Sequence, residues 1–357
     1  MVLVRQIVSA ALVAFVLLFG SLAGPAAGTS TLAIYFIDVE GGQSTLIVTP
    51  SGESLLVDTG FPGDGTFASK PGDPQTSRDA RRIAAVASEA GVKKIDYLLI
   101  THFHGDHDGG VVELSQLLPI RTFIDHDTVP PEAEAVAGTL DLFQRYAAVR
   151  AKSRHIVARP GDRLPLKDVD ATVVTSAREV LSRPLAGAGS ANPACSAPSP
   201  EEQEVIENPR STGLMLRFGR FRFLDVGDLV TTPLRALFCP VDRVGPVDAY
   251  LVTHHGNADA ADPATFAALK PRTAIVNNGA TKGGAPQLLG MLQDLKIDSW
   301  QLHRSTNPAS RNADAARIAN LDETTANVIR LDANDDGSFA VTNGRTKLSI
   351  RYPSVRQ

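Results

Sequence analysis

The sequence contains little cysteine, with two residues, Cys195 and Cys239, among 357. Two cysteines exclude a disulfide-rich scaffold and a zinc site built from cysteine alone. Positive charge is not in excess either, because 35 Lys and Arg face 39 Asp and Glu, and the net charge of -4 provides no strong surface for nucleic acid. Hydrophobic residues make up 43% of the chain, which is enough for a sizeable core and excludes a disordered protein.

Long hydrophobic runs are confined to the N-terminus. Arg5 is followed by an apolar run from Ile7 to Phe19 and then by small residues up to Gly28. This layout predicts that residues 1–28 are a signal peptide and that the protein is secreted or periplasmic, with no membrane contact after cleavage. The alternative is an uncleaved anchor that leaves the protein facing outside, because the uncharged run from Gln6 to Ile37 exceeds the ~20 residues that span a bilayer.

Export also bears on the two cysteines. In an oxidising compartment Cys195 and Cys239 can form a disulfide. The alternative is that Cys239, which follows the apolar pair Leu237 and Phe238, remains a free buried thiol. The spacing along the chain does not decide between the two.

Residues 29–357 are predicted to form a single domain of short apolar strands, turns and occasional helices. Residues 184–210 lose all hydrophobic periodicity and are expected to form one long surface loop. The C-terminal segment 327–352 is expected to be a hairpin that turns at Asn334–Gly337. The expected strands are 32–38, 43–49, 53–58, 95–101, 120–125, 155–158, 171–175, 212–218 and 221–226, and the expected helices are 77–90, 111–118 and 134–150.

A weak internal repeat relates the two halves of this domain. The segment 95–104 is similar to 247–255, and the segment 54–60 is similar to 221–228. In each half one apolar strand ends in Asp-X-Gly and a later strand ends in Thr-His. We therefore expect two packed sheets, with one functional site along the edge where both halves present these strand ends.

The most informative segment is Thr101–Gly110, which reads Thr-His-Phe-His-Gly-Asp-His-Asp-Gly-Gly and begins where an apolar strand ends. His102 and His104 alternate past the strand end onto one side, so both can bind one ion. Asp106 and His107 lie on the turn that follows and are expected to face a second ion. Because imidazole and carboxylate ligands select divalent transition metals, we expect zinc, with manganese or iron as alternatives.

Further ligands must come from other segments of the chain. Asp228 follows a strand and is expected to bridge the two ions through its two carboxylate oxygens. Of the neighbours His254 and His255, one is expected to bind metal and the other to orient a ligand or contact substrate, and we assign the ligand role to His254. Asp58 ends another strand and is expected to accept a hydrogen bond from a ligand histidine.

Together these residues resemble those of the metallo-β-lactamase fold hydrolases. The resemblance rests on His-X-His-X-Asp-His after a buried strand, on Asp58-Thr-Gly, on Asp228 and on His254, and it covers nearly the whole chain after the signal peptide. It implies an α/β fold, a four-layer αβ/βα sandwich in which two mixed sheets pack face to face with helices outside.

A narrower resemblance is to the extracytoplasmic hydrolase domain of DNA-uptake proteins of the ComEC/Rec2 type. It rests on Asp38–Gln43, Asn208–Ser211, Gly227–Asp228 and His254–Gly256. Many members of the superfamily carry a ligand histidine for the first ion where this chain has Asn208 and Ser211, and His126 or His155 could take that place. His126 is otherwise a substrate contact or an ordinary loop histidine. The chain contains no multi-span membrane channel, which excludes DNA uptake itself.

The resemblance and the ligand set predict an exported hydrolase with two divalent ions, in which a metal-bound hydroxide attacks a phosphodiester or another phosphate ester. Asp106 and Asp228 are the expected catalytic residues, and Lys282, Asn278 and Arg210 are candidates for contacting an anionic, small or nucleotide-like substrate. Hydrolysis of a lactone or β-lactam is the alternative reaction, since the chemistry at the ions would be nearly the same. A non-catalytic binding protein that keeps the fold is the remaining alternative, supported by the missing histidine.

Overall fold

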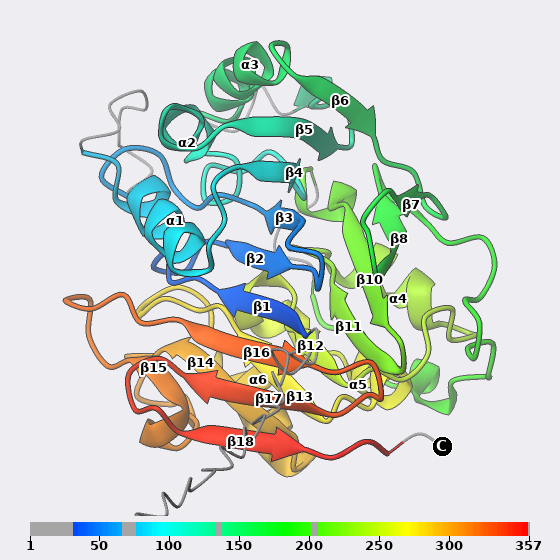
Figure 1. Cartoon of the computed structure of the whole chain (residues 1–357). Helices are drawn as coiled ribbons and strands as arrows, with labels where there is room; N and C mark the ends of the chain where they lie inside the picture. Colours follow the sequence, from blue (N-terminus) through cyan, green and yellow to red (C-terminus); the bar gives the residue numbers. More distant parts are fainter. Residues whose placement is uncertain (1–30, 66–75, 133–137, 202–205, 356–357) are drawn as a thin grey trace, which may run out of the picture. The chain divides into compact units, whose positions relative to one another are not determined.

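Two nine-stranded mixed β-sheets form the framework of the computed structural model, which describes residues 31–65, 76–132, 138–201 and 206–355 (Figure 1). The predicted signal peptide, residues 1–28, lies outside the described residues. Residues from Thr31 onward form one compact unit. Within the described ranges, no helix is long and apolar enough to cross a membrane.

The first sheet has the strand order β18-β17-β16-β1-β2-β3-β4-β5-β6. Strands β3 to β6 run parallel to one another, and the other neighbouring pairs are antiparallel. The strand bounds are β1 Leu32–Phe36, β2 Thr45–Val48, β3 Ser54–Val57, β4 Ile95–Leu99, β5 Ile120–Asp125, β6 Arg154–Val157, β16 Ile329–Ala333, β17 Phe339–Asn343 and β18 Ser349–Tyr352.

The second sheet has the order β15-β14-β13-β12-β11-β10-β8-β7, with β9 paired to β8. Strands β11 to β15 are parallel, so each sheet combines a parallel and an antiparallel part. The bounds are β7 Arg163–Leu164, β8 Asp170–Ser176, β9 Glu179–Val180, β10 Gly213–Phe218, β11 Phe221–Asp225, β12 Ala249–Leu251, β13 Thr273–Val276, β14 Asp298–His303 and β15 Ile318–Asn320.

Helices cover the outer face of each sheet. An apolar cluster joins the first sheet to α1 (Arg78–Glu89), α2 (Val111–Leu117) and α3 (Thr139–Arg150). A second cluster joins the other sheet to α4 (Thr231–Phe238), α5 (Pro263–Leu269) and α6 (Pro286–Asp294). The third cluster lies between the sheets. The predicted sandwich of two mixed sheets with helices outside is therefore confirmed.

Alternation along β1 shows how one strand supplies two of these cores. Leu32, Ile34 and Phe36 belong to the core between the sheets, where Phe36 meets Phe223 of β11 with ring centroids 5.8 Å apart. Tyr35 packs against the helix-side core instead. Because successive side chains point to opposite faces of a sheet, a strand buried on both faces reads as a continuous apolar run.

Helix α1 forms as the sequence predicts. Ile83, Val86 and Ala87 recur on one face of the helix and are buried against the first sheet. The helix stops at Gly91, whose φ of 74° is the left-handed conformation that glycine adopts easily, and the Val92 N–H then bonds to the Ala87 carbonyl at 2.8 Å.

Two segments differ from the predicted structure. The C-terminal segment 327–352 contains three strands, β16, β17 and β18, instead of a single hairpin, although its first turn lies at Asn334–Gly337 as expected. The segment 184–210 is less irregular than a long loop, because its described part holds two short 3-10 helices, η2 (Pro193–Ser196) and η3 (Asn208–Arg210).

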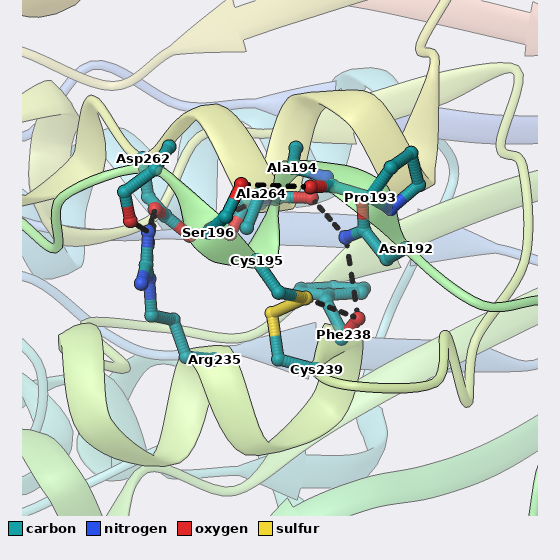
Figure 2. Close-up of a disulfide and its surroundings, with 12 residues drawn as sticks. Asn192, Pro193, Ala194, Cys195, Ser196, Arg235, Phe238, Cys239, Asp262 and Ala264 are labelled. Carbon is teal, nitrogen blue, oxygen red and sulfur yellow. Dashed lines mark hydrogen bonds and ion pairs between the residues drawn. A yellow bond between two sulfur atoms is a disulfide. The ribbon is translucent and has the colours of Figure 1, made fainter.

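A disulfide joins Cys195 of η2 to Cys239 at the end of α4 (Figure 2). It decides the open question about the two cysteines, because no free cysteine remains. Neighbouring hydrogen bonds hold the same segment. The Asn192 side-chain amide donates to the carbonyl of Phe238 at 3.2 Å and to that of Ala264 at 2.9 Å. The segment is thereby attached to α4 and α5.

Candidate metal centre

The site forms where strands of both sheets end. The loop that carries His102, His104, Asp106 and His107 connects β4 of the first sheet to α2. Asp228 follows β11 and His255 follows β12, and β11 and β12 are parallel neighbours in the second sheet. The repeated strand ends of the two halves thus meet at one place, as the sequence predicts.

Four side chains converge there: Asp106, His107, Asp228 and His255, all buried and each offering one ligand atom within 4.8 Å of the others. His107 Nε2 lies 3.4 Å from Asp106 Oδ2, 3.2 Å from Asp228 Oδ2 and 3.3 Å from His255 Nε2. His255 Nε2 lies 3.2 Å from Asp106 Oδ2 and 3.0 Å from Asp228 Oδ2.

These distances fit ligands around a common ion. For ligand bonds of about 2.0–2.1 Å in a tetrahedral site, neighbouring ligand atoms lie about 3.3–3.4 Å apart. The observed spacing of 3.0 to 3.4 Å is close to that value in the five pairs that involve an imidazole nitrogen. The residues therefore fit a divalent transition metal, and the donor set of two imidazoles and two carboxylates suits zinc, manganese or iron.

Asp58 contacts His107 through the ring nitrogen that points away from the cluster. Its Oδ2 lies 2.7 Å from His107 Nδ1, which leaves Nε2 directed at the cluster. The same carboxylate accepts hydrogen bonds from the Thr101 N–H and hydroxyl, both at 2.8 Å. Asp58 thereby fixes both the tautomer of His107 and the start of the loop.

The charges of the cluster depend strongly on one another. Burial opposes ionisation of Asp228, but His107 and His255 outweigh burial and hold the pKa of Asp228 well below its ordinary value. Burial likewise disfavours a charged imidazole, yet the three carboxylates of Asp228, Asp106 and Asp58 raise the pKa of His107 well above its ordinary value. Without an ion, a proton on His107 therefore balances the carboxylates, and metal binding should release that proton.

His102 and His104 form a second pair of donors beside this cluster. His102 Nε2 lies 3.0 Å from His104 Nδ1, and the rings of His102 and His107 have centroids 4.1 Å apart. Burial and the neighbouring histidines lower the pKa of His102 well below its ordinary value, so its ring is neutral and can offer a lone pair to a metal. Within the described residues, no third His, Cys or carboxylate is grouped with this pair.

His254 and His255 face different partners, although they are adjacent. His254 Nδ1 lies 2.9 Å from both oxygens of Asp259, and its Nε2 is 3.2 Å from Asn208 Nδ2 and 3.9 Å from Asp228 Oδ2. His255 alone of the two belongs to the four-residue cluster. The geometry thus favours His255 as the metal ligand. The assignment of His254 as a ligand, made from the sequence, stays a prediction.

The N-terminal part of the chain matches a known family. Residues 37–179 match the family model described as the metallo-beta-lactamase superfamily. This segment is therefore similar to members of that superfamily. The match includes the motif from His102 to His107 and ends before Asp228 and His255. No curated protein matches the chain.

Solved structures with a similar arrangement share little sequence with this chain. A putative metal-dependent hydrolase from Parabacteroides distasonis is 17% identical, with 76% of this chain and 92% of that chain covered and a TM-score of 0.41. The metallo-beta-lactamase fold protein YhfI from Bacillus subtilis is 13% identical, with 76% and 95% covered and a TM-score of 0.45. CmlA, a diiron β-hydroxylase from Streptomyces venezuelae, is 16% identical with a TM-score of 0.41, over 77% of this chain and 53% of CmlA, so the chain spans about half its length.

Two histidines considered as replacement ligands, His126 and His155, lie in hydrogen-bond networks outside the four-residue cluster. His126 Nε2 is 3.2 Å from Glu207 Oε2, which also accepts a hydrogen bond from the Phe103 N–H at 3.1 Å. His155 Nε2 is 2.8 Å from Asp125 Oδ1. Neither histidine belongs to a group of metal-ligand atoms among the described residues. His126 instead helps Glu207 to hold the backbone between His102 and His104.

The three candidates for substrate contact lie at different distances from the cluster of ligand atoms and have different partners. Lys282 donates a hydrogen bond to Asp106 Oδ2 and therefore lies at the centre. The Asn278 amide donates to the carbonyls of Gly279 at 2.9 Å and His303 at 2.8 Å, which gives it a structural role in its turn. Arg210 Nε lies 4.0 Å from Glu207 Oε1.

One cluster was not predicted from the sequence. His303, at the end of β14, lies 2.7 Å from Asp38 Oδ1 and 3.3 Å from Glu40 Oε2. Arg82 also pairs with both carboxylates, at 3.1 Å and 3.0 Å. The guanidinium already supplies a cation there, so the cluster acts as an ion-pair network. The position of His303 at the end of an apolar strand could have indicated this cluster, but no other histidine lies next to His303 in the sequence.

Proposed function

We propose that the protein is a metal-dependent hydrolase with two divalent ions, and that its substrate is a phosphodiester or another phosphate ester. The observation that carries the proposal is the close spacing of four buried ligand atoms that follow strands of both sheets, in which each imidazole nitrogen lies 3.0 to 3.4 Å from the other three atoms. A catalytic metal site needs such donors together with a position open to substrate.

Each residue has a role in this proposal. Asp106, His107, Asp228 and His255 would hold one ion, and His102 and His104 would hold the other. Asp228 is the residue that would serve both ions, since its Oδ2 faces the first group while its Oδ1 is buried without a hydrogen-bond partner among the described residues. Such an atom is costly to leave unsatisfied, and a second ion would satisfy it.

When bound, ions of this kind acidify a water molecule and stabilise negative charge that develops on the substrate. The protein itself buries the metal-ligand atoms away from water and fixes their orientation. Asp58 orients His107, Asp259 orients His254, and Glu207 holds the backbone of the loop at Phe103. The ammonium of Lys282 adds a positive charge that favours an anionic substrate such as a phosphate ester.

The protein loaded with zinc, manganese or iron is to be assayed on bis-p-nitrophenyl phosphate, single-stranded DNA and a chromogenic cephalosporin. Hydrolysis of a phosphodiester supports the proposal, and activity on the cephalosporin alone would overturn its substrate. Asp228→Asn should lower hydrolysis by about 100-fold or more, because the ions lose their shared ligand. Asp248→Asn is the matched control, since Asp248 is also buried but lies before β12, at the opposite end of that strand.

A binding protein without turnover is the second candidate, supported by the pair His102 and His104, for which no further imidazole or carboxylate is grouped within the described part of the chain. Counting ions by elemental analysis separates the candidates. Two ions per chain favour the enzyme, whereas one ion without hydrolysis favours the binding protein.

Export to a secreted or periplasmic location is part of the proposal. The disulfide between Cys195 and Cys239 supports it, because such bonds persist in oxidising compartments. Expression of the full chain followed by cell fractionation tests it, and a protein found only in the cytoplasmic fraction would contradict it.

A further inference from the structure

Lys282 lies on a turn that is built against the metal centre. The turn connects β13 to α6, and the Gly279 N–H closes it by donating to the Lys282 carbonyl at 2.8 Å. The Gly284 N–H then donates to the carbonyl of His255 at 3.0 Å. The backbone that presents Lys282 is therefore tied to a residue of the cluster.

Close packing leaves this turn little freedom. A Cβ atom on Gly283 would overlap the carbonyl of His255, and one on Gly279 would overlap the carbonyl of Glu40. Glycine is needed at both positions because other backbone approaches within the space of a side chain. Lys282 is thus held in place on two sides, unlike a lysine on a solvated loop.

The ammonium of Lys282 occupies a position that an ion would contest. It donates to Asp106 Oδ2, the same oxygen that lies 3.2 Å from His255 Nε2 and 3.4 Å from His107 Nε2. The Phe61 ring lies 5.6 Å from the ammonium, and the side chain is 30% exposed. An ion bound to that oxygen repels the ammonium, which must then find another negative partner close by.

We propose that Lys282 is an anion-binding residue set free by the metal. In the metal-free protein it neutralises Asp106, and once the ion binds Asp106, the displaced ammonium donates hydrogen bonds to an anionic oxygen of the ligand. The fixed turn keeps it at the edge of the centre, and its partial exposure lets it meet a ligand that enters from solvent. This inference rests on the proposed function for its metal site but concerns binding, which can be measured without turnover.

The first test measures metal affinity. Zinc binding to the metal-free protein is followed at fixed pH by competition with a chromophoric chelator. Lys282→Met should bind zinc about tenfold more tightly than the unchanged protein, because a charge-assisted hydrogen bond to Asp106 no longer competes. Equal or weaker zinc affinity in Lys282→Met would overturn the displacement.

The second test measures anion affinity with inorganic phosphate as the probe, by calorimetry on the zinc-loaded protein. Lys282→Met should lose about tenfold in phosphate affinity, and Lys282→Arg should retain most of it because the charge is kept. Lys93→Met is the control, since Lys93 is exposed before β4, at the end of that strand away from the site. Unchanged phosphate affinity in Lys282→Met refutes the anion-binding role, whereas a loss in a protein that hydrolyses no ester refutes only the proposed enzyme.

Discussion

Replacing Asp58 with asparagine tests whether Asp58 keeps His107 in the tautomer that can bind metal. The asparagine oxygen can still accept the hydrogen bond from the Thr101 N–H, now 2.8 Å from Asp58 Oδ1. Its amide then faces His107 Nδ1, which lies 2.7 Å from Asp58 Oδ2, and donates to that nitrogen. The proton of the neutral imidazole must move to Nε2, the atom that faces the cluster, so the altered His107 cannot bind metal without changing tautomer.

Asp58→Asn should therefore weaken metal binding by about 10- to 100-fold, the range measured for residues that orient metal ligands. The metal-free protein should lose some stability, because the Thr101 hydroxyl loses its carboxylate acceptor and protonated His107 loses one of its three carboxylate partners. Asp58→Ala should instead unfold easily, since it leaves the Thr101 and His107 N–H groups buried and unpaired, at a cost of roughly 2–6 kcal/mol out of a typical 5–15 kcal/mol.

The assays are zinc competition with a chromophoric chelator and urea unfolding of the metal-free variants. Asp248→Asn serves as the control for removing a buried carboxylate far from the site. Wild-type zinc affinity in Asp58→Asn would refute the assignment of His107 Nε2 as a ligand atom held by Asp58.

Three further outcomes are expected. His255→Ala should lose an ion and His254→Ala should keep it, as counted by elemental analysis after desalting, because only His255 lies in the cluster; the reverse pattern would restore His254 as the ligand. Burial raises the pKa of Asp79 to about 6, so its folded state holds the proton that the unfolded chain releases near pH 4. Stability should thus fall by up to about 3 kcal/mol as the pH rises from about 4 to about 6, and Asp79→Asn should flatten this part of a urea-denaturation pH profile; identical profiles would contradict the shift. Replacing Cys195 and Cys239 by alanine opens a loop with a separation of 44 residues. The loss should be about 4 kcal/mol at most by chain entropy, measured by thermal unfolding, with zinc affinity kept; a large loss of zinc affinity would show that the bond shapes the site.

Strand ends made much of the site predictable. The motif directly follows an apolar strand, and it contains His102, His104, Asp106 and His107. A loop that follows a parallel strand lies at the edge of the sheet, where functional residues are common. Asp228 was found in the same way. These predictions needed only the pattern of buried strands and the polar residues that interrupt it.

The choice between His254 and His255 depends on their backbone conformation, which the hydrophobic pattern of the sequence does not reveal. Both residues have positive φ, 50° and 53°, in the short 3-10 helix η4 (His254–Gly256) after β12. Strand alternation no longer applies in left-handed conformation, so the side that each ring faces cannot be extrapolated from the strand. Tertiary contacts to Asp259 and Asp228 decide it instead.

Contacts between distant segments were the other unpredicted part. Asp38 and His303 meet across 265 positions, and neither stands in a motif with the other. The two cysteines were equally ambiguous, because a spacing of 44 residues permits a bond without requiring one, and the fold places their Cα atoms 5.7 Å apart. Such proximity arises from the tertiary fold and is not given by the separation along the chain.

Because Asp106 and His107 follow a strand of the first sheet whereas Asp228 and His255 follow strands of the second, a bound ion would cross-link two layers that are otherwise held together by their apolar interface. A substitution in the apolar interface that shifts one layer against the other should therefore change the metal occupancy, even when it lies far from solvent. Chelation should in turn let the layers part more readily on heating, so that the melting temperature reports how full the site is.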